Sequence, residues 1–192
     1  MNREILNTNS GKIAMLAMLT VLSLILTYLE SVFSLTVTIP GVKLGLANIA
    51  VLMAMYIYDA REAVVVTICK ILFVTIFFGN MYSLLYAITG ALFSLVAMIL
   101  CVKIFDLNII VVSMYGGLLH NIGQLIVARL ILSSIALSYY LPVMTIGGII
   151  CGLIVGIITI FILKLTKLYN LSGVYNITKT KDLQTYTTKD GN

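Results

Sequence analysis

Four ionisable side chains stand inside long apolar runs of this chain, at positions where a charge needs a specific reason. They are Glu30, Lys70, His120 and Arg129. An ionised side chain at the centre of a bilayer costs about 3 kcal/mol even on lenient scales, so such residues mark sites for ligands, ions or protons. Their chemistry is that of ion pairing and hydrogen bonding to a polar molecule.

Uncharged polar residues share helix faces with these ionisable groups. One arc of about 100° on the first apolar run carries Thr20, Ser23, Thr27, Glu30, Ser31 and Ser34. His120, Asn121 and Gln124 share a similar arc on a later run, and Asn48 begins another. We expect a cavity that opens to the outside, lined by Glu30, Lys43, Asn48, Lys70, His120, Asn121, Gln124 and Arg129.

The charges of this set favour an anionic or phosphorylated small molecule, because three cations, Lys43, Lys70 and Arg129, face one carboxylate. Structural alternatives stay open. Glu30 could pair with Arg129 or Lys43 as a bridge, His120 could be a core histidine, and serine and threonine hydroxyls could bond their own helix. A lone histidine with no acidic partner predicts no metal site, and we expect no cofactor.

The composition indicates the elements that hold these residues. Of 192 residues, 61% are hydrophobic and 10% charged, which excludes a water-soluble globule. Unbroken apolar runs exclude a β-barrel. We predict an all-α integral membrane protein, a bundle of six transmembrane helices over residues 12–34, 44–58, 63–78, 83–102, 109–132 and 141–163. Residues 12–165 form the membrane domain, between a polar N-terminus (1–11) and a polar tail (166–192) that we expect to be disordered.

The distribution of basic residues predicts the orientation. Six spans place both termini on one side, together with Arg3, Lys12, Arg61, Lys103, Lys164 and Lys167. The opposite side has Lys43, with Arg129 close to it. Basic residues accumulate on cytoplasmic loops, so we expect a multi-pass protein of the cell membrane with both termini in the cytoplasm. No basic cluster on a polar domain suggests nucleic acid.

The last apolar run carries Gly148, Gly152 and Gly156 at four-residue spacing. Glycines so spaced line one helix face and allow another backbone to approach closely. We favour packing against a neighbouring helix of the same chain, and a partner subunit is the alternative.

Two separated motifs carry a resemblance to a known family. They are Pro40-Gly-Val-Lys-Leu-Gly-Leu-Ala-Asn-Ile49 and His120-Asn-Ile-Gly-Gln-Leu125, the latter followed by Tyr140-Leu-Pro142. The chain resembles, over about residues 12–165, the Gx transporter family, also labelled heptaprenyl diphosphate synthase component I. It is similar to the S components of energy-coupling factor (ECF) transporters. That similarity implies a six-helix, S-component-like bundle that binds a vitamin or cofactor precursor from outside.

The resemblance also implies partners: a membrane coupling subunit with paired cytoplasmic ATPases. S components commonly present an Ala-x-x-x-Ala face on their first span, whereas this chain has Ala14-Met-Leu-Ala17. Members of the family are also similar to a membrane protein that pairs with a small extracytoplasmic protein in flavin-linked electron transfer.

The residues rank the functional classes. No GxxxxGK[ST] motif occurs, so we expect a substrate-binding subunit that is energised by a partner. Seven acidic residues include no DDxxD motif, so we expect no autonomous catalysis. An accessory role in polyprenyl (heptaprenyl) diphosphate or quinone synthesis is the alternative. Paired haem histidines and cysteine clusters, which would indicate a redox centre, do not occur.

Overall fold

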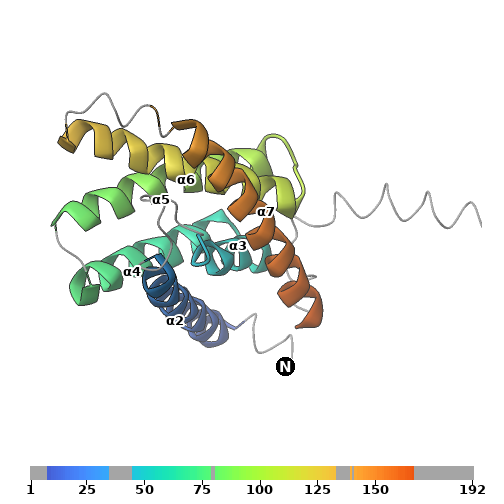
Figure 1. Ribbon diagram of the computed structural model, residues 1–192. Coiled ribbons are helices and arrows are strands. Elements are labelled where there is room, and N and C mark those ends of the chain that lie inside the picture. The colour runs from blue at the N-terminus through green and yellow to red at the C-terminus, as the bar shows by residue number, and fades with distance from the viewer. Residues whose placement is uncertain (1–7, 35–44, 79–80, 133–138, 140, 167–192) are drawn as a thin grey trace, which may run out of the picture.

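The chain folds into six α-helices, with no strand, over the residues that the computed structural model describes (8–34, 45–78, 81–132, 139 and 141–166). The helices are α2 (Asn9–Ser34), α3 (Asn48–Ile57), α4 (Ala60–Phe78), α5 (Met81–Lys103), α6 (Ile109–Leu132) and α7 (Leu141–Leu165) (Figure 1). The prediction of an all-helical chain with helices in these six places is confirmed. Residues 1–7, the first half of the first motif (residues 40–44, with Lys43) and the tail from residue 167 lie outside the described residues.

Four of the helices are long and apolar enough to cross a membrane: α2, α5, α6 and α7. The remaining two differ from them. Helix α4 has 19 residues but carries three charged side chains, Arg61, Glu62 and Lys70. Helix α3 has 10 residues, which span about 15 Å, or about half of the hydrocarbon core of a bilayer. The chain is therefore a membrane-like helical protein, and the crossing of a bilayer by all six helices stays a prediction.

Helix α3 is a core element. All ten of its residues are buried, and it packs against α2, α4 and α7 in the middle of the bundle (Figure 1). A helix that is apolar on every side is stable only when it is surrounded by protein or lipid. Its first residue, Asn48, consequently lies inside the molecule.

One end of the bundle gathers charged side chains from three helices. Lys12 of α2 forms an ion pair with Glu62 of α4, and its Nζ lies 5.4 Å from the centroid of the Tyr58 ring. Lys103 Nζ, at the end of α5, lies 3.5 Å from Asp59 Oδ2. These contacts fix the start of α2 and the end of α5 to the α3–α4 junction.

Helix α6 packs most extensively, against α5 on one side and α7 on the other. The glycines of α7 face α6 of the same chain. A Cβ added at Gly152 would lie 2.5 Å from the Ser113 carbonyl oxygen, and one at Gly148 would lie 2.8 Å from that of Gly117. Because these neighbours are backbone atoms, the two helices approach as closely as glycine permits. We call this contact the glycine seam: Gly117 of α6 with Gly148, Gly152 and Gly156 of α7.

Candidate functional site

A cavity of about 90 Å³ lies where α2, α4 and α6 meet the start of α3. Its walls are Thr27, Glu30, Gly45, Ala47, Asn48, Lys70, Ile71, Val74, Ala87, His120 and Gln124. We call it the polar chamber. The structure thus brings together five of the side chains that the sequence predicted to converge: Glu30, Asn48, Lys70, His120 and Gln124.

Glu30 connects α2 to the residue that leads into α3. Its side chain is 7% exposed, and its Oε1 accepts a hydrogen bond from the backbone N–H of Gly45 at 2.6 Å. Gly45 has φ +69°, in the left-handed region that favours glycine. Gly45 is part-buried, and a backbone N–H that no helix satisfies needs such a partner in an apolar bundle. Glu30 is therefore a structural anchor as well as a wall of the chamber.

Lys70 reaches the chamber from the opposite helix, α4, and is 9% exposed. It brings a cation to a wall that Ile71 and Val74 of the same helix make apolar. The carboxylate of Glu30 and the ammonium of Lys70 balance each other in formal charge among the described walls of the chamber. A site of this kind can pair with both donors and acceptors of a ligand.

His120 and Gln124 stand one turn apart on α6 and contact each other. Their Nε2 atoms lie 3.0 Å apart, so the amide donates to the ring when the neutral imidazole carries its proton on Nδ1. Gly90 of α5 leaves room for both, because a Cβ there would lie 2.9 Å from Gln124 Cγ and 3.0 Å from His120 Cε1. Our reading of the sequence missed Gly90, although an isolated glycine inside an apolar helix is a signal of close packing.

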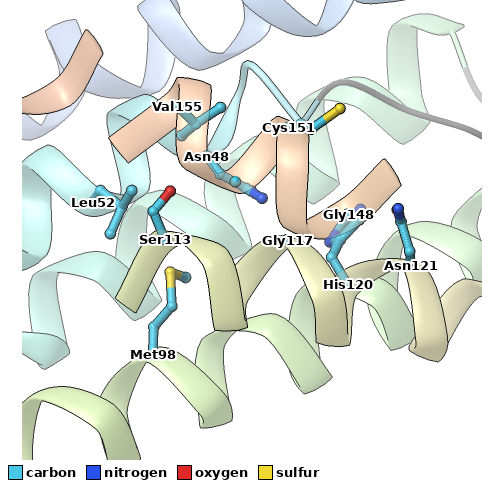
Figure 2. Close-up of a pocket in the computed structure, with 12 residues that line it drawn as sticks. Asn48, Leu52, Met98, Ser113, Gly117, His120, Asn121, Gly148, Cys151 and Val155 are labelled. Carbon is cyan, nitrogen blue, oxygen red and sulfur yellow. The ribbon is translucent and has the colours of Figure 1, made fainter. Parts of the chain in front are cut away.

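A second, smaller cavity adjoins the polar chamber. Its volume is about 10 Å³, which is room for about one water molecule. Asn48, His120 and Gly45 border both cavities. Figure 2 shows this small cavity between α3, α6 and α7, with Leu52, Met98 and Ser113 on one side and Asn121 on the other.

Asn121 borders the small cavity and not the polar chamber. Its Nδ2 donates a hydrogen bond to the Met144 carbonyl oxygen at 3.0 Å, and its side chain is 2% exposed. Sequence reasoning grouped Asn121 with His120 and Gln124, but one step along a helix turns a side chain by about 100°. That turn directs Asn121 to α7, where it fixes the seam between α6 and α7.

The described hydroxyl groups of the polar stripe on α2 form their hydrogen bonds within that helix. The hydroxyls of Thr20, Ser23 and Thr27 donate to the carbonyl oxygens of Leu16, Thr20 and Ser23. Of these three side chains, Thr27 alone lines the chamber. The side chains of Ser31 and Ser34 lie outside the described part of the chain. The structural alternative for the stripe, in which hydroxyls bond their own helix, describes these three residues.

Arg129 lies apart from the other predicted site residues. It is exposed in the last turn of α6 and lines neither cavity. Five positions separate it from Gln124, which turns it about 140° away from that side chain. Lys43 lies outside the described residues. The described walls of the polar chamber therefore do not carry the surplus of positive charge that the sequence predicted.

The chemistry available in the chamber is hydrogen bonding and ion pairing. It offers one carboxylate, one ammonium, one imidazole and two carboxamides. Within the described ranges, no three side chains of the types His, Cys, Asp and Glu come together as metal ligands would. This set of groups is suited to holding a small polar molecule.

Comparison with known proteins places this architecture in a family. No curated protein and no solved structure matches the chain. The family described as heptaprenyl diphosphate synthase component I matches residues 19–162, which include every residue that lines the two cavities. Because this match spans well over half of the chain, the protein belongs to the heptaprenyl diphosphate synthase component I family.

Proposed function

We propose that this protein is the substrate-binding membrane subunit of an uptake system of the ECF type, for a small polar molecule such as a vitamin or cofactor precursor. The observation that carries the proposal is the polar chamber. Charged and amide side chains from α2, α3, α4 and α6 converge on one cavity inside an otherwise apolar bundle. Such groups are costly in a membrane unless something polar meets them. A concave site with a few convergent polar groups is the usual form of a small-molecule site.

The volume of the chamber limits the ligand. At about 90 Å³ it is well below the roughly 300–1,000 Å³ of sites for drug-sized ligands. The ligand is accordingly small, or the helices separate when it binds. An anionic or phosphorylated molecule was the expectation from the sequence, and the co-purified ligand will test it.

The proposed partners follow from what the chain lacks and from its charged end. Its 192 residues contain no GxxxxGK[ST] motif, so a membrane coupling subunit with cytoplasmic ATPases would supply the energy. Lys12, Arg61, Lys103 and Lys164 stand at helix ends on the side that we propose to be cytoplasmic. In this arrangement the chain is a multi-pass protein of the cell membrane with both termini inside. A small extracytoplasmic partner in flavin-linked electron transfer is the alternative partner set.

The family description favours a second candidate, an accessory membrane component of heptaprenyl diphosphate or quinone synthesis. In that role the chain would hold a polyprenyl diphosphate for a catalytic partner and would not itself catalyse the condensation. The small volume of the chamber argues against enclosure of a polyprenyl chain there.

Native mass spectrometry of the full chain, purified in mild detergent or nanodiscs, separates the two candidates. The uptake proposal predicts a small polar molecule bound at one per chain, and predicts its loss from Lys70→Met. The identified molecule is then supplied in labelled form to cells that express the protein, and accumulation is the expected result. A bound polyprenyl diphosphate, or condensation activity of the purified chain, would contradict the uptake proposal.

A further inference from the structure

The first residue of α3, Asn48, places between the two cavities a carboxamide that no described residue hydrogen-bonds. We infer that Asn48 is the recognition group of the polar chamber, and that it selects an electrically neutral ligand with an N–H and a C=O side by side, as in a cyclic amide or cyclic urea. This inference rests on the proposed function and names the class of molecule that the site would take.

Asn48 differs from the other amides of the site in what it contacts. Its side chain is 9% exposed and borders both cavities, and Figure 2 shows it directed from α3 toward the face of α6 that carries Ser113 and Gly117. Its backbone N–H donates to the Gly45 carbonyl oxygen at 2.9 Å. No described residue hydrogen-bonds its carboxamide, whereas Asn121 is bonded to Met144 and Gln124 contacts His120.

An amide in this position needs a complement. A carboxamide has two N–H donors and an oxygen that accepts two hydrogen bonds. The polar atoms of Asn48 are not among the fully buried, unpartnered atoms of the described residues, so they face the space of the two cavities. Leaving them there without a hydrogen-bond partner is costly in an apolar bundle. A ligand that satisfies both ends of the amide at once removes that cost.

The charges around Asn48 favour a neutral ligand over an anion. The start of a helix attracts negative charge through its free N–H groups. Here a carboxylate already lies close to that start, because Glu30 accepts the N–H of Gly45, three residues before Asn48. The first N–H groups of α3, those of Asn48 and Ile49, are bonded to the carbonyl oxygens of Gly45 and Leu46. Lys70 brings one positive charge to the same chamber, which balances Glu30. A second anion would therefore meet a site without surplus positive charge among its described walls.

Geometry then gives the class of ligand. The donor and the acceptor of a carboxamide lie side by side, so they pair in two places with a ring that presents an adjacent N–H and C=O, as amide side chains pair with base edges. Ala87, Ile71 and Val74 form apolar parts of the wall that suit the face of a ring. One ring with such an edge is also consistent with the small volume of the chamber.

The test uses the full chain in nanodiscs and defined probes. Uracil and 2-piperidone present the required edge, and their N-methylated counterparts do not. Inorganic phosphate and benzoate are the anionic probes. Binding is measured by calorimetry on the wild type, on Asn48→Asp, which is isosteric but loses the donor, and on Asn48→Ser as a second variant if the first fails to fold. Ser113→Ala, in the small cavity alone, is the control.

We expect a cyclic-amide probe to bind the wild type at least tenfold more tightly than its methylated counterpart does, and at least tenfold more tightly than it binds either Asn48 variant. The Ser113→Ala protein should bind within twofold of the wild type. Binding of the anionic probes alone, or equal binding of methylated and unmethylated rings, overturns the inference and leaves the uptake proposal standing. Absence of binding by every probe also overturns it, and the uptake proposal falls only if native mass spectrometry finds no bound molecule either.

Discussion

The glycine seam and the polar chamber are two regions where helices meet inside one bundle, and they use glycine in opposite ways. In the seam, a Cβ added at Gly117 would lie 2.4 Å from the Gly148 carbonyl oxygen, which belongs to a backbone that cannot rotate away. In the chamber, a Cβ added at Gly90 would meet the side chains of Gln124 and His120. Glycine closes the distance between backbones in the first region and leaves space for polar side chains in the second. We therefore expect substitutions in the seam to act mainly on stability and, under the proposed function, substitutions in the chamber to act mainly on binding.

The largest effect on stability is expected from Gly152→Ala. The added methyl would lie 2.5 Å from the Ser113 carbonyl oxygen and 2.7 Å from Met114 Cα, so α6 and α7 must separate. Overpacking of this kind costs about 1–3 kcal/mol. Thermal unfolding in detergent measures it. Gly156→Ala is the matched control. The nearest atom to its added methyl would lie at 3.0 Å, so its loss of stability should be smaller. Equal stability of Gly152→Ala and the wild type would contradict the account of the seam.

The largest effect on binding is expected from Lys70→Met, which keeps the length of the side chain and removes the buried cation. Removal of a charge-assisted hydrogen bond to the ligand should weaken binding at least tenfold. Arg129→Ala, a change at the exposed cation of α6, should leave the affinity within twofold of the wild type. Titration of both variants with the co-purified molecule gives the comparison. A stronger effect at Arg129 than at Lys70 would return Arg129 to the site.

A smaller effect is expected from Gly90→Ala. Its methyl would meet Gln124 Cγ at 2.9 Å and His120 Cε1 at 3.0 Å, and these side chains can turn, so binding should weaken several-fold while unfolding changes little. Gly116→Ala is the control. Its methyl would meet the flexible Met98 side chain at 2.9 Å, and neither residue lines the polar chamber. If both variants bind alike, Gly90 does not position His120 and Gln124.

The smallest effect is expected at the charged end of the bundle. Asp59→Asn removes an ion pair with Lys103 in which the two side chains are 40% and 49% exposed, and such pairs contribute about 0–1 kcal/mol. Glu62→Gln should cost more, because Glu62 is 13% exposed and pairs with Lys12. Unfolding at low and high salt compares the two, and the reverse order would contradict this interpretation of the charged end.

The fold was largely predictable from the sequence, and the site only in part. Apolar runs bounded by charged or glycine-containing turns predict the places of all six helices. Each run has to be covered by protein or lipid along its whole length, and a helix satisfies its backbone hydrogen bonds there. The same reasoning predicted that five polar side chains lie together, because polar groups inside an apolar bundle are stable only beside other polar groups. These are Glu30, Asn48, Lys70, His120 and Gln124. It could not tell which neighbour each face meets. Periodicity relates residues on one helix, whereas Asn121 at the seam, Gly90 beside the chamber and the exposed Arg129 depend on contacts between helices.

The most direct test of the central claim is an experimental structure of the full chain with the molecule that co-purifies with it. The account predicts density for one small molecule in the polar chamber, within hydrogen-bond distance of Asn48 and Lys70, while the distances across the glycine seam stay unchanged. A filled interior in which Glu30 and Lys70 pack directly on each other, with the bound molecule elsewhere on the protein, would contradict it.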